Sequence, residues 1–172
     1  MTTYISLLRG INVSGKNMIK MPELVATLDK AGFTDVRTYI QSGNIVFRYR
    51  KTESIELAHT IEKIISEAFG LTVAVLVLTA EELSAVVSGN PFLKIPGIDT
   101  EKLHVTFLFE MPSDEAVEKL FSYSNPPDEM MISGKGVYLY LPGGYGLTKF
   151  NNGFIENKLG MFGSLFLLRH QE

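Results

Sequence analysis

Residues 36–49 read VRTYIQSGNIVFRY, and this stretch decides the fold. On each side of Ser42-Gly43, β-branched and aromatic residues alternate with polar ones, which is the period of a strand. Gly43 supplies the positive φ that a tight turn between two strands requires. The stretch therefore predicts a β-hairpin, with strands at residues 36–41 and 44–49.

The segments around the hairpin predict one helix and one strand on either side of it. A short apolar run at residues 4–8 is typical of a buried strand, and Pro22 opens a helical pattern that ends at Gly32. Behind the hairpin, Thr52 is placed to cap a second helix, which Gly70 ends before a β-branched strand at residues 72–78. Residues 1–79 thus predict the order β-α-β-β-α-β.

The same order returns later in the chain. A connector at residues 80–102 opens with the capping-box pattern Thr79-x-x-Glu82. Residues 103–172 then predict strands at 103–110, 130–133, 137–141 and 164–169, and helices at 113–123 and 148–159. Ser113 is placed to cap the first of these helices.

The ferredoxin-like fold, also called the α-β plait, is the known structure with this element order. We therefore expect an α+β protein of two tandem ferredoxin-like halves that form one compact body, with the helices on one face of each sheet. From the crossover rule we expect the first and third strands of each half to be adjacent and parallel.

The composition is that of an ordinary globular protein. The 172 residues are 45% hydrophobic and 20% charged, with a net charge of −3 and no cysteine. These values exclude disulfides and cysteine nucleophiles, and they give no global attraction to nucleic acid or anionic membranes. The first residues lack a signal-peptide pattern, and the longest apolar run, residues 73–78, is far shorter than the ~20 residues that cross a bilayer. We expect a cytoplasmic protein without membrane contact.

The connection between the first strand and the first helix, residues 9–21, is unusually long. Its counterpart in the second half is only Met111-Pro112, so the fold itself does not require a long connection. Connections in compact domains usually have about 4–6 residues, and longer ones are more often functional. We therefore expect a ligand site in this loop, with Arg9, Asn12, Lys16 and Asn17 as its main contacts.

Residues 10–16 of the loop fit the G-x-x-x-x-G-K part of a phosphate-binding P-loop. A P-loop needs Ser or Thr after the lysine to hold magnesium, and a helix that starts at once. Here Asn17 follows Lys16, the helix waits until Pro22, and the element order is wrong for a P-loop NTPase. A nest of glycine amides with Lys16 that binds an anion is favoured instead, and a glycine-bent surface loop without a ligand is the alternative.

Three motifs resemble one known family. They are RGINVSGKN at residues 9–17, VRTYIQSGNIVF at residues 36–47, and KFNNGFIENKLG at residues 149–160. Together they resemble the bacterial DUF1697 proteins over nearly the whole chain. The resemblance implies a pair of α-β plaits and no established activity, substrate or cofactor. That family commonly continues with a Thr-x-Arg-Asn-Trp type segment, which this chain lacks, so the role of residues 161–172 stays open.

Further candidate ligand contacts lie outside the long loop. Turn chemistry explains Asn44 beside the hairpin turn, but it does not explain Gln41, whose amide could face a ligand. Lys149 could serve an anion at the start of the last helix, where capping is a sufficient reason for Asn152. The histidines fall on separate elements without a carboxylate or hydroxyl nearby in sequence, so neither a catalytic triad nor a metal site is predicted.

The function that these observations favour is binding of a small anionic ligand, such as a nucleotide or phosphorylated metabolite, with catalysis and cofactors left open. A module for single-stranded nucleic acid is one alternative, because sheets of this kind can stack bases on strand aromatics. Strand alternation points Phe47 and Tyr49 toward the helices and puts Arg37, Tyr39 and Arg48 on the other face, which is basic and weakly aromatic.

A non-catalytic interaction scaffold is the other alternative. Several strands are apolar on both faces, and such strands are usually covered on both. We expect the other half or a second subunit in a homodimer to cover the faces that lie away from the helices.

One expectation concerns the geometry of the first half. If its first and third strands are parallel, Lys16 and Arg50 lie near one end of the sheet, and Gln41 and Asn44 lie near the opposite end. The long loop and the hairpin turn would then be far apart.

Overall fold

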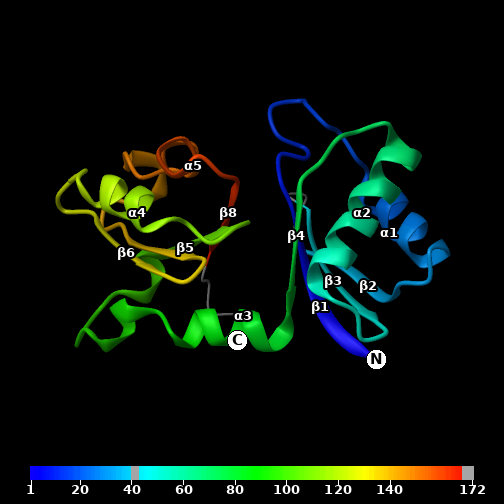
Figure 1. The fold of residues 1–172 in the computed structure, drawn as a ribbon, viewed down its shortest axis with the longest axis horizontal. Helices are drawn as coiled ribbons and strands as arrows, with labels where there is room; N and C mark the ends of the chain where they lie inside the picture. The colour runs from blue at the N-terminus through cyan, green and yellow to red at the C-terminus, as the bar shows by residue number, and fades with distance from the viewer. Residues whose placement is uncertain (40–42, 168–172) are drawn as a thin grey trace. The chain divides into compact units, whose positions relative to one another are not determined.

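A computed structural model describes residues 1–39 and 43–167 of the chain. The chain divides into two compact units, unit 1 (Met1–Ala85) and unit 2 (Val86–Glu172). Each unit contains one four-stranded antiparallel sheet with helices, so the protein is α+β (Figure 1). None of the helices in the described ranges is long and apolar enough to cross a membrane.

Unit 1 has the element order β-α-β-β-α-β that the sequence predicts. Its elements are β1 (Thr2–Leu8), α1 (Met21–Lys30), β2 (Thr34–Tyr39), β3 (Asn44–Tyr49), α2 (Ser54–Phe69) and β4 (Val75–Thr79). The strands follow the order β2-β3-β1-β4 across the sheet, and all neighbours are antiparallel.

The predicted parallel pairing of the first and third strands is wrong. β1 and β3 are neighbours, but they are antiparallel, with Thr2 opposite Tyr49 and Leu7 opposite Asn44. The crossover rule applies to β1 and β2, which α1 connects, and these two strands do run in the same direction. Because β3 returns antiparallel to β2 and lies between the two, it must also be antiparallel to β1.

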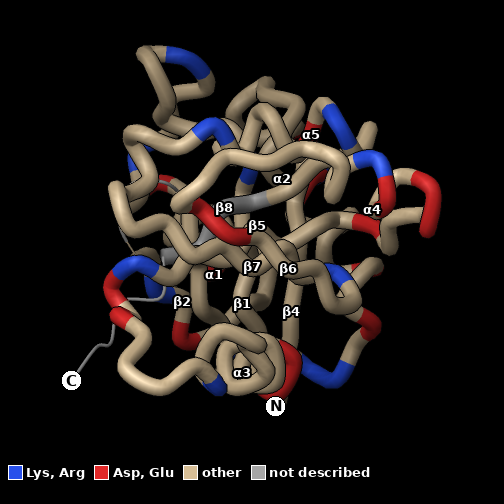
Figure 2. The backbone as a smooth tube through the Cα atoms, turned by 90° about the vertical axis from the view of Figure 1, so that its left-hand side faces the viewer, with Lys and Arg blue, Asp and Glu red and all other residues tan. Residues whose placement is uncertain are grey.

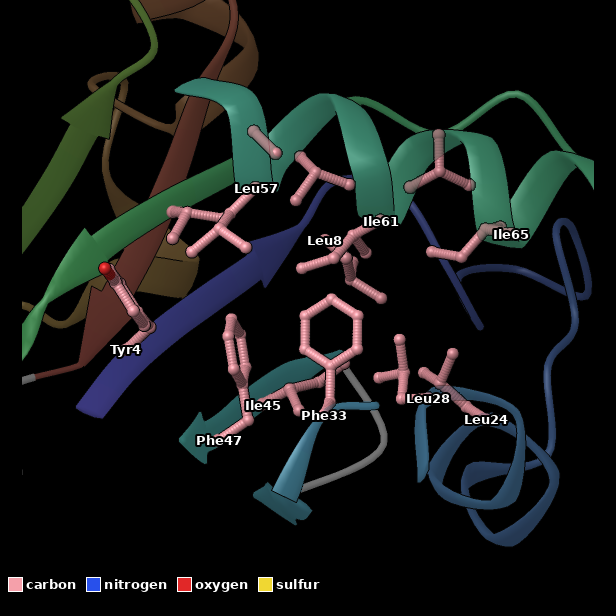
Figure 3. Close-up of a cluster of buried hydrophobic side chains, with 14 of the residues drawn as sticks. Tyr4, Leu8, Leu24, Leu28, Phe33, Ile45, Phe47, Leu57, Ile61 and Ile65 are labelled. Atoms are coloured by element: carbon pink, nitrogen blue, oxygen red, sulfur yellow. The ribbon is translucent and has the colours of Figure 1, made fainter. Parts of the chain in front are cut away.

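The core of unit 1 lies between the sheet and helices α1 and α2, which cover the same face (Figures 1 and 3). Leu57, Ile61 and Ile65 recur at helical spacing along α2, and all three are buried against the strands. Phe47 is buried in this core and Tyr49 packs against it, so the prediction that both rings face the helices is confirmed.

The ends of α1 and α2 depend on particular residues. Gly32 follows α1 with φ 92°, and Gly70 ends α2 with φ 67°, as the sequence predicts. Thr52 does not cap α2, because the N-cap is Glu53 and its side chain makes no capping bond. Instead, the Tyr4 hydroxyl donates to Thr52 O at 2.8 Å and accepts from Thr52 N at 3.0 Å, which fixes the start of α2 to β1.

Helix α3 (Ala80–Ser88) begins with the predicted capping box. Thr79 N donates to Glu82 Oε2 at 2.8 Å, and Glu82 N donates to Thr79 Oγ1 at 3.1 Å. Two short 3-10 helices, Pro91–Lys94 and Thr100–Lys102, complete the connector.

Unit 2 then continues in the order β-α-β-β-α-β. Its elements are β5 (Leu103–Leu108), α4 (Asp114–Phe121), β6 (Glu129–Ser133), β7 (Gly136–Tyr140), α5 (Asn152–Leu159) and β8 (Gly163–Leu167). Its sheet is antiparallel throughout, in the order β6-β7-β5-β8. The predicted end of the last strand, at residue 169, lies outside the described residues.

The helices of unit 2 begin at side-chain caps. Ser113 caps α4 as predicted, since its Oγ accepts from Ala116 N at 3.2 Å. Helix α5 begins later than predicted, because Asn151 is its N-cap and accepts from Phe154 N at 2.9 Å. The residues before it include a separate 3-10 helix, Tyr145–Leu147.

The connector covers part of the face of β7 that lies away from α4 and α5. The Tyr138 hydroxyl donates to Val86 O at 3.1 Å, and the rings of Phe92 and Tyr140 lie 6.1 Å apart. Burial of its phenol raises the pKa of Tyr138. Part of the apolar sheet face is therefore covered within unit 2 itself.

Candidate functional site

The long loop of unit 1, residues 9–21, meets the start of β3 at one end of the sheet. Leu8 N donates to Gly43 O at 3.1 Å, and Arg9 N donates to Ala74 O at 2.9 Å, just before β4. Arg50 follows Tyr49 at the opposite end, since Tyr49 pairs with Thr2. The expected separation of the loop from Asn44 is therefore wrong, and the antiparallel pairing of β1 and β3 is the reason.

Gly43 contacts the loop so closely that a side chain in its place would force its neighbours to move. A Cβ atom there would lie 2.6 Å from Ile11 Cδ1 and 2.9 Å from Leu8 Cβ, and the backbone φ is 84°. Ile11 is fully buried and belongs to the core of unit 1. The base of the loop is thus anchored in the core and against the residue that leads into β3.

Side-chain amides hold the loop in shape. Asn12 Nδ2 donates to Ile19 O at 3.0 Å and Asn12 Oδ1 accepts from Ile19 N at 2.8 Å, while Asn17 Nδ2 donates to Gly10 O at 3.1 Å. Asn12 N also donates to Asn17 O at 3.1 Å. The two asparagines therefore build the loop, because their amides bond its own backbone.

The tip of the loop is a tight turn. Lys16 N donates to Val13 O at 2.9 Å, and the two central residues have positive φ, 51° at Ser14 and 72° at Gly15. Positive φ at both central positions is the pattern of a type I′ hairpin turn. The GxxxxGK match is thus part of a small hairpin, whereas a P-loop wraps its amides around phosphate at the start of a helix.

The charged residues of the loop itself are all cations, although one of them, Lys20, has its Nζ 4.0 Å from Glu23 Oε1 of α1. Residues 1–22, 36–52 and 68–80 contain no Asp or Glu, so the loop and the neighbouring ends of β3 and β4 carry only cations. Lys16 is exposed and Arg9 is half-buried. In Figure 2 the loop stands at the top and is marked only in blue, whereas α3 carries red. A chain with net charge −3 therefore has a local basic region here.

Two further predicted contacts, Asn44 and Gln41, belong to unit 1. Asn44 is the first residue of β3, opposite Leu7 of β1 and Tyr39 of β2, so it lies at the same end of the sheet as the loop. Gln41 lies outside the described residues.

A cleft of about 940 Å³ opens at the opposite end of unit 1. It lies between the start of β1, the end of β3 and the starts of α2 and α3, and it is lined by Thr2, Tyr4, Arg50, Lys51, Thr52, Glu53, Ser54, Glu56, Thr79, Glu81 and Glu82. Carboxylates outnumber cations in this lining, so the cleft is less suited to an anion than the loop is. Four separate segments of the chain form this cleft, so no single stretch of the sequence indicates it.

Lys149 and Asn152 belong to unit 2, where their surroundings differ. Lys149 is exposed, with its Nζ 6.0 Å from the centre of the Tyr123 ring. Asn152 N donates to the Tyr145 hydroxyl at 2.6 Å, and Asn152 Nδ2 donates to Gly163 O at 3.1 Å. Burial raises the pKa of Tyr145. Asn152 thus connects α5 to the start of β8.

The histidines occupy distinct environments. His59 has a carboxylate neighbour that the sequence analysis overlooked, since its Nδ1 lies 3.2 Å from Glu62 Oε2, one helical turn away. Glu62 Oε1 accepts from Val75 N at 3.0 Å, so this carboxylate mainly fixes α2 to β4. His104 is only 6% exposed, and burial lowers its pKa. Among the described residues no group of histidines and carboxylates could hold a metal ion.

Comparison with solved structures gives one informative neighbour. A conserved bacterial protein, SP0830 from Streptococcus pneumoniae, matches with a TM-score of 0.68 and 25% sequence identity, over 81% of this chain and 77% of the other. No curated protein matches the sequence significantly. The family model for proteins of unknown function DUF1697 matches residues 1–138, which include the loop and both motifs of unit 1. The chain therefore belongs to the DUF1697 family.

Proposed function

We propose that the protein binds a small anionic ligand at the loop of residues 9–21, with Lys16 as the main cationic contact and Arg9 as the second. The observation that carries the proposal is a preformed, acid-free loop whose exposed lysine lies at a hairpin turn. Asn12 and Asn17 contribute to binding indirectly, because their side-chain amides bond the loop backbone and hold its shape.

Preorganisation is the physical reason for favouring this loop. A ligand that meets a loop already held by internal hydrogen bonds does not have to order it, so less of the interaction energy is lost. The loop and the neighbouring strand ends contain no carboxylate of their own, which favours phosphate or carboxylate groups as ligands.

The test is a titration of the full chain with phosphate, AMP and ATP, monitored by the backbone amide NMR signals of residues 9–21. We expect saturable shifts in these signals that Lys16→Ala weakens by about tenfold or more, since a lost charge-assisted hydrogen bond costs roughly 1.5–3 kcal/mol. Lys63→Ala is the matched control, because Lys63 is exposed on α2 and forms an ion pair with Glu67 at 3.9 Å. Binding that Lys16→Ala leaves unchanged would contradict the proposal.

A single-stranded nucleic acid is the second candidate, and one observation favours it. The face of β2 and β3 away from the helices carries Arg37, Tyr39, Val46 and Arg48, with Tyr39 48% exposed and Val46 37% exposed. An exposed ring on a strand face that also carries guanidinium groups is typical of a base-stacking surface. Arg48 also lies 3.6 Å from Asp35, which reduces its availability to phosphate.

Tyr39→Ala separates the two candidates. If nucleic acid is the ligand, Tyr39→Ala weakens binding of an oligonucleotide of ten or more bases, and affinity falls steeply with salt. If the loop is the site, Tyr39→Ala leaves the affinity for small anions unchanged. The absence of binding to both probes would favour a non-catalytic interaction scaffold.

We also propose that the two units are ferredoxin-like plaits derived from one ancestral unit. The corresponding sheet orders, β2-β3-β1-β4 and β6-β7-β5-β8, and the repeated element order support this proposal. An experimental structure in which the six elements of one unit superpose in order on those of the other is the expected outcome. A different path of the chain in either unit would contradict it.

A further inference from the structure

Two lysines lie near one tyrosine ring on the surface of unit 2, and a third lysine precedes that tyrosine by four residues at the end of α4. Lys158 Nζ lies 4.7 Å from the centre of the Tyr123 ring, and Lys149 Nζ lies 6.0 Å from it. Lys119 is exposed near the end of α4 and also acts on Tyr123 through its charge. Tyr123 follows α4, Lys149 precedes α5 and Lys158 lies within α5, so the packing of these two helices creates the cluster.

The positive charges of this cluster are not balanced by neighbouring carboxylates. Within the described ranges, none of the three lysines forms an ion pair with an acidic side chain. Glu156 lies on the same helix as Lys158, and its Oε1 accepts from Gly163 N at 3.0 Å and from Asn152 Nδ2 at 3.3 Å. Like charges gathered without a counter-charge repel one another, and a bound anion relieves that repulsion.

The phenol responds to these ammonium groups. A hydrogen bond from Lys158, together with the charges of Lys158, Lys119 and Lys149, lowers the pKa of Tyr123 despite partial desolvation. The ring and its hydroxyl therefore sense the local charge directly. The remaining charged residues of α4, Asp114, Glu115 and Glu118, do not contribute to this shift.

We propose that Lys119, Lys149 and Lys158, with the Tyr123 hydroxyl, form a binding site for a diphosphate group. Three ammonium groups match the charge of a diphosphate better than that of a phosphate monoester, which carries about −1.5 to −2 near neutral pH. Lys158 lies over the Tyr123 ring, and Phe154 packs on that ring edge-to-face at 5.2 Å. Little aromatic surface is left for a base, so recognition is of the diphosphate alone.

The test uses the full chain with tyrosine labelled at Cζ, so that NMR measures the pKa of Tyr123 with and without inorganic pyrophosphate. We expect saturable binding near pH 7.5, and a bound anion that raises the pKa of Tyr123 toward its ordinary value of 10.0. ADP should bind within a few-fold of pyrophosphate, and AMP at least tenfold more weakly. These two arms distinguish a free diphosphate from a nucleotide recognised through its base.

Substitutions then locate the site. Lys158→Gln and Lys149→Gln should each weaken pyrophosphate binding by about tenfold or more, and Lys158→Arg should retain it, since the charge is kept. Lys135→Gln, in the turn between β6 and β7, is the matched control and should bind like the wild type. Melting curves of the variants exclude loss of binding through unfolding.

The diphosphate site is separate from the loop in unit 1. Lys16→Ala should therefore leave the response of Tyr123 to pyrophosphate unchanged. Failure of one proposal therefore does not entail failure of the other. Three results would overturn the diphosphate site. They are the absence of a saturable response, a response that Lys158→Gln does not change, and ADP that binds far more tightly than pyrophosphate.

Discussion

Asn12 and Ile19 hold each other through both hydrogen-bonding groups of one side-chain amide. Asn12 Oδ1 accepts from Ile19 N at 2.8 Å, and Asn12 Nδ2 donates to Ile19 O at 3.0 Å. This pair mimics two rungs of a strand ladder across a loop that has no strand of its own. Asn12 also has φ 53°, a conformation that asparagine tolerates better than most residues.

Asn12→Ala should therefore destabilise the protein by about 1–3 kcal/mol, because it leaves two partly buried backbone groups without their partners. Urea unfolding measures this loss, and hydrogen exchange of the Ile19 amide should accelerate more than that of residues in β1. Asn12→Asp should have an intermediate effect, since its carboxylate accepts from Ile19 N but cannot donate to Ile19 O. Unchanged exchange at Ile19 in the alanine variant would show that the bond pair does not hold the loop.

Gly43→Ala should destabilise unit 1 by about 2–4 kcal/mol, through a positive φ and a steric clash together. The added Cβ would lie 2.6 Å from Ile11 Cδ1, so the buried Ile11 must move. Gly15→Ala is the matched control, because Gly15 has φ 72° and nothing within 4 Å of its added Cβ. The difference between the two free energies of unfolding isolates the clash, and equal losses would refute it.

The buried His104 makes stability depend on pH. Burial lowers the pKa of its imidazole below the ordinary 6.5, against the smaller effect of the hydrogen bond to Lys102 O. The unfolded chain then binds the proton more readily than the folded chain does, so this contribution is fully present above pH 6.5 and decreases as the pH falls toward the folded pKa. His104→Gln should flatten the pH dependence of the free energy of unfolding in this window.

An NMR titration of the His104 ring gives the direct measurement. Its midpoint should lie below 6.5, and the ring of Tyr145, 5.6 Å away, should report the same transition. A midpoint at or above 6.5 would mean that burial does not control this histidine.

Thr148 connects two loops of unit 2 through its hydroxyl. Thr148 Oγ1 donates to Asp128 Oδ2 at 2.7 Å and accepts from Phe150 N at 3.0 Å, and Asn125 Nδ2 donates to the same Asp128 oxygen at 2.9 Å. Thr148→Val keeps the shape and removes these bonds, so thermal unfolding should report a loss of about 1–3 kcal/mol. Thr148→Ser should retain most of the stability. A valine variant as stable as the wild type would show that water replaces the hydroxyl.

The sequence predicts the elements that depend on local chemistry. Local signals are found as predicted, because each acts within one or two helical turns. They are the capping box at Thr79, the cap at Ser113 and the helix-ending glycines 32 and 70. The direction of β3 relative to β1 follows from the hairpin that joins β3 to β2, and the crossover rule does not apply to this pair, because α1 joins β1 to β2.

The candidate site was predictable only in part. Loop length and glycine content identify residues 9–21, but they cannot reveal that the amide of Asn12 closes the loop, since this depends on the path of the backbone. The sequence does indicate the pair of His59 and Glu62, because the two residues occupy the i and i+3 positions of a helix. The sequence does not indicate the lysines near Tyr123, because these residues meet only when α4 and α5 pack together.

The amide pair of Asn12 and Ile19 also divides the loop into a fixed frame and an exchangeable tip. Ile11 and Ile19 are both buried, so the frame is held from inside, while Val13 and Met18 beyond it are more than half exposed. Substitutions or insertions at residues 13–16 therefore alter what the loop presents without altering the ends that present it. Relatives with one framework can acquire different specificities here, and the same position is suited to displaying a grafted peptide with both ends restrained.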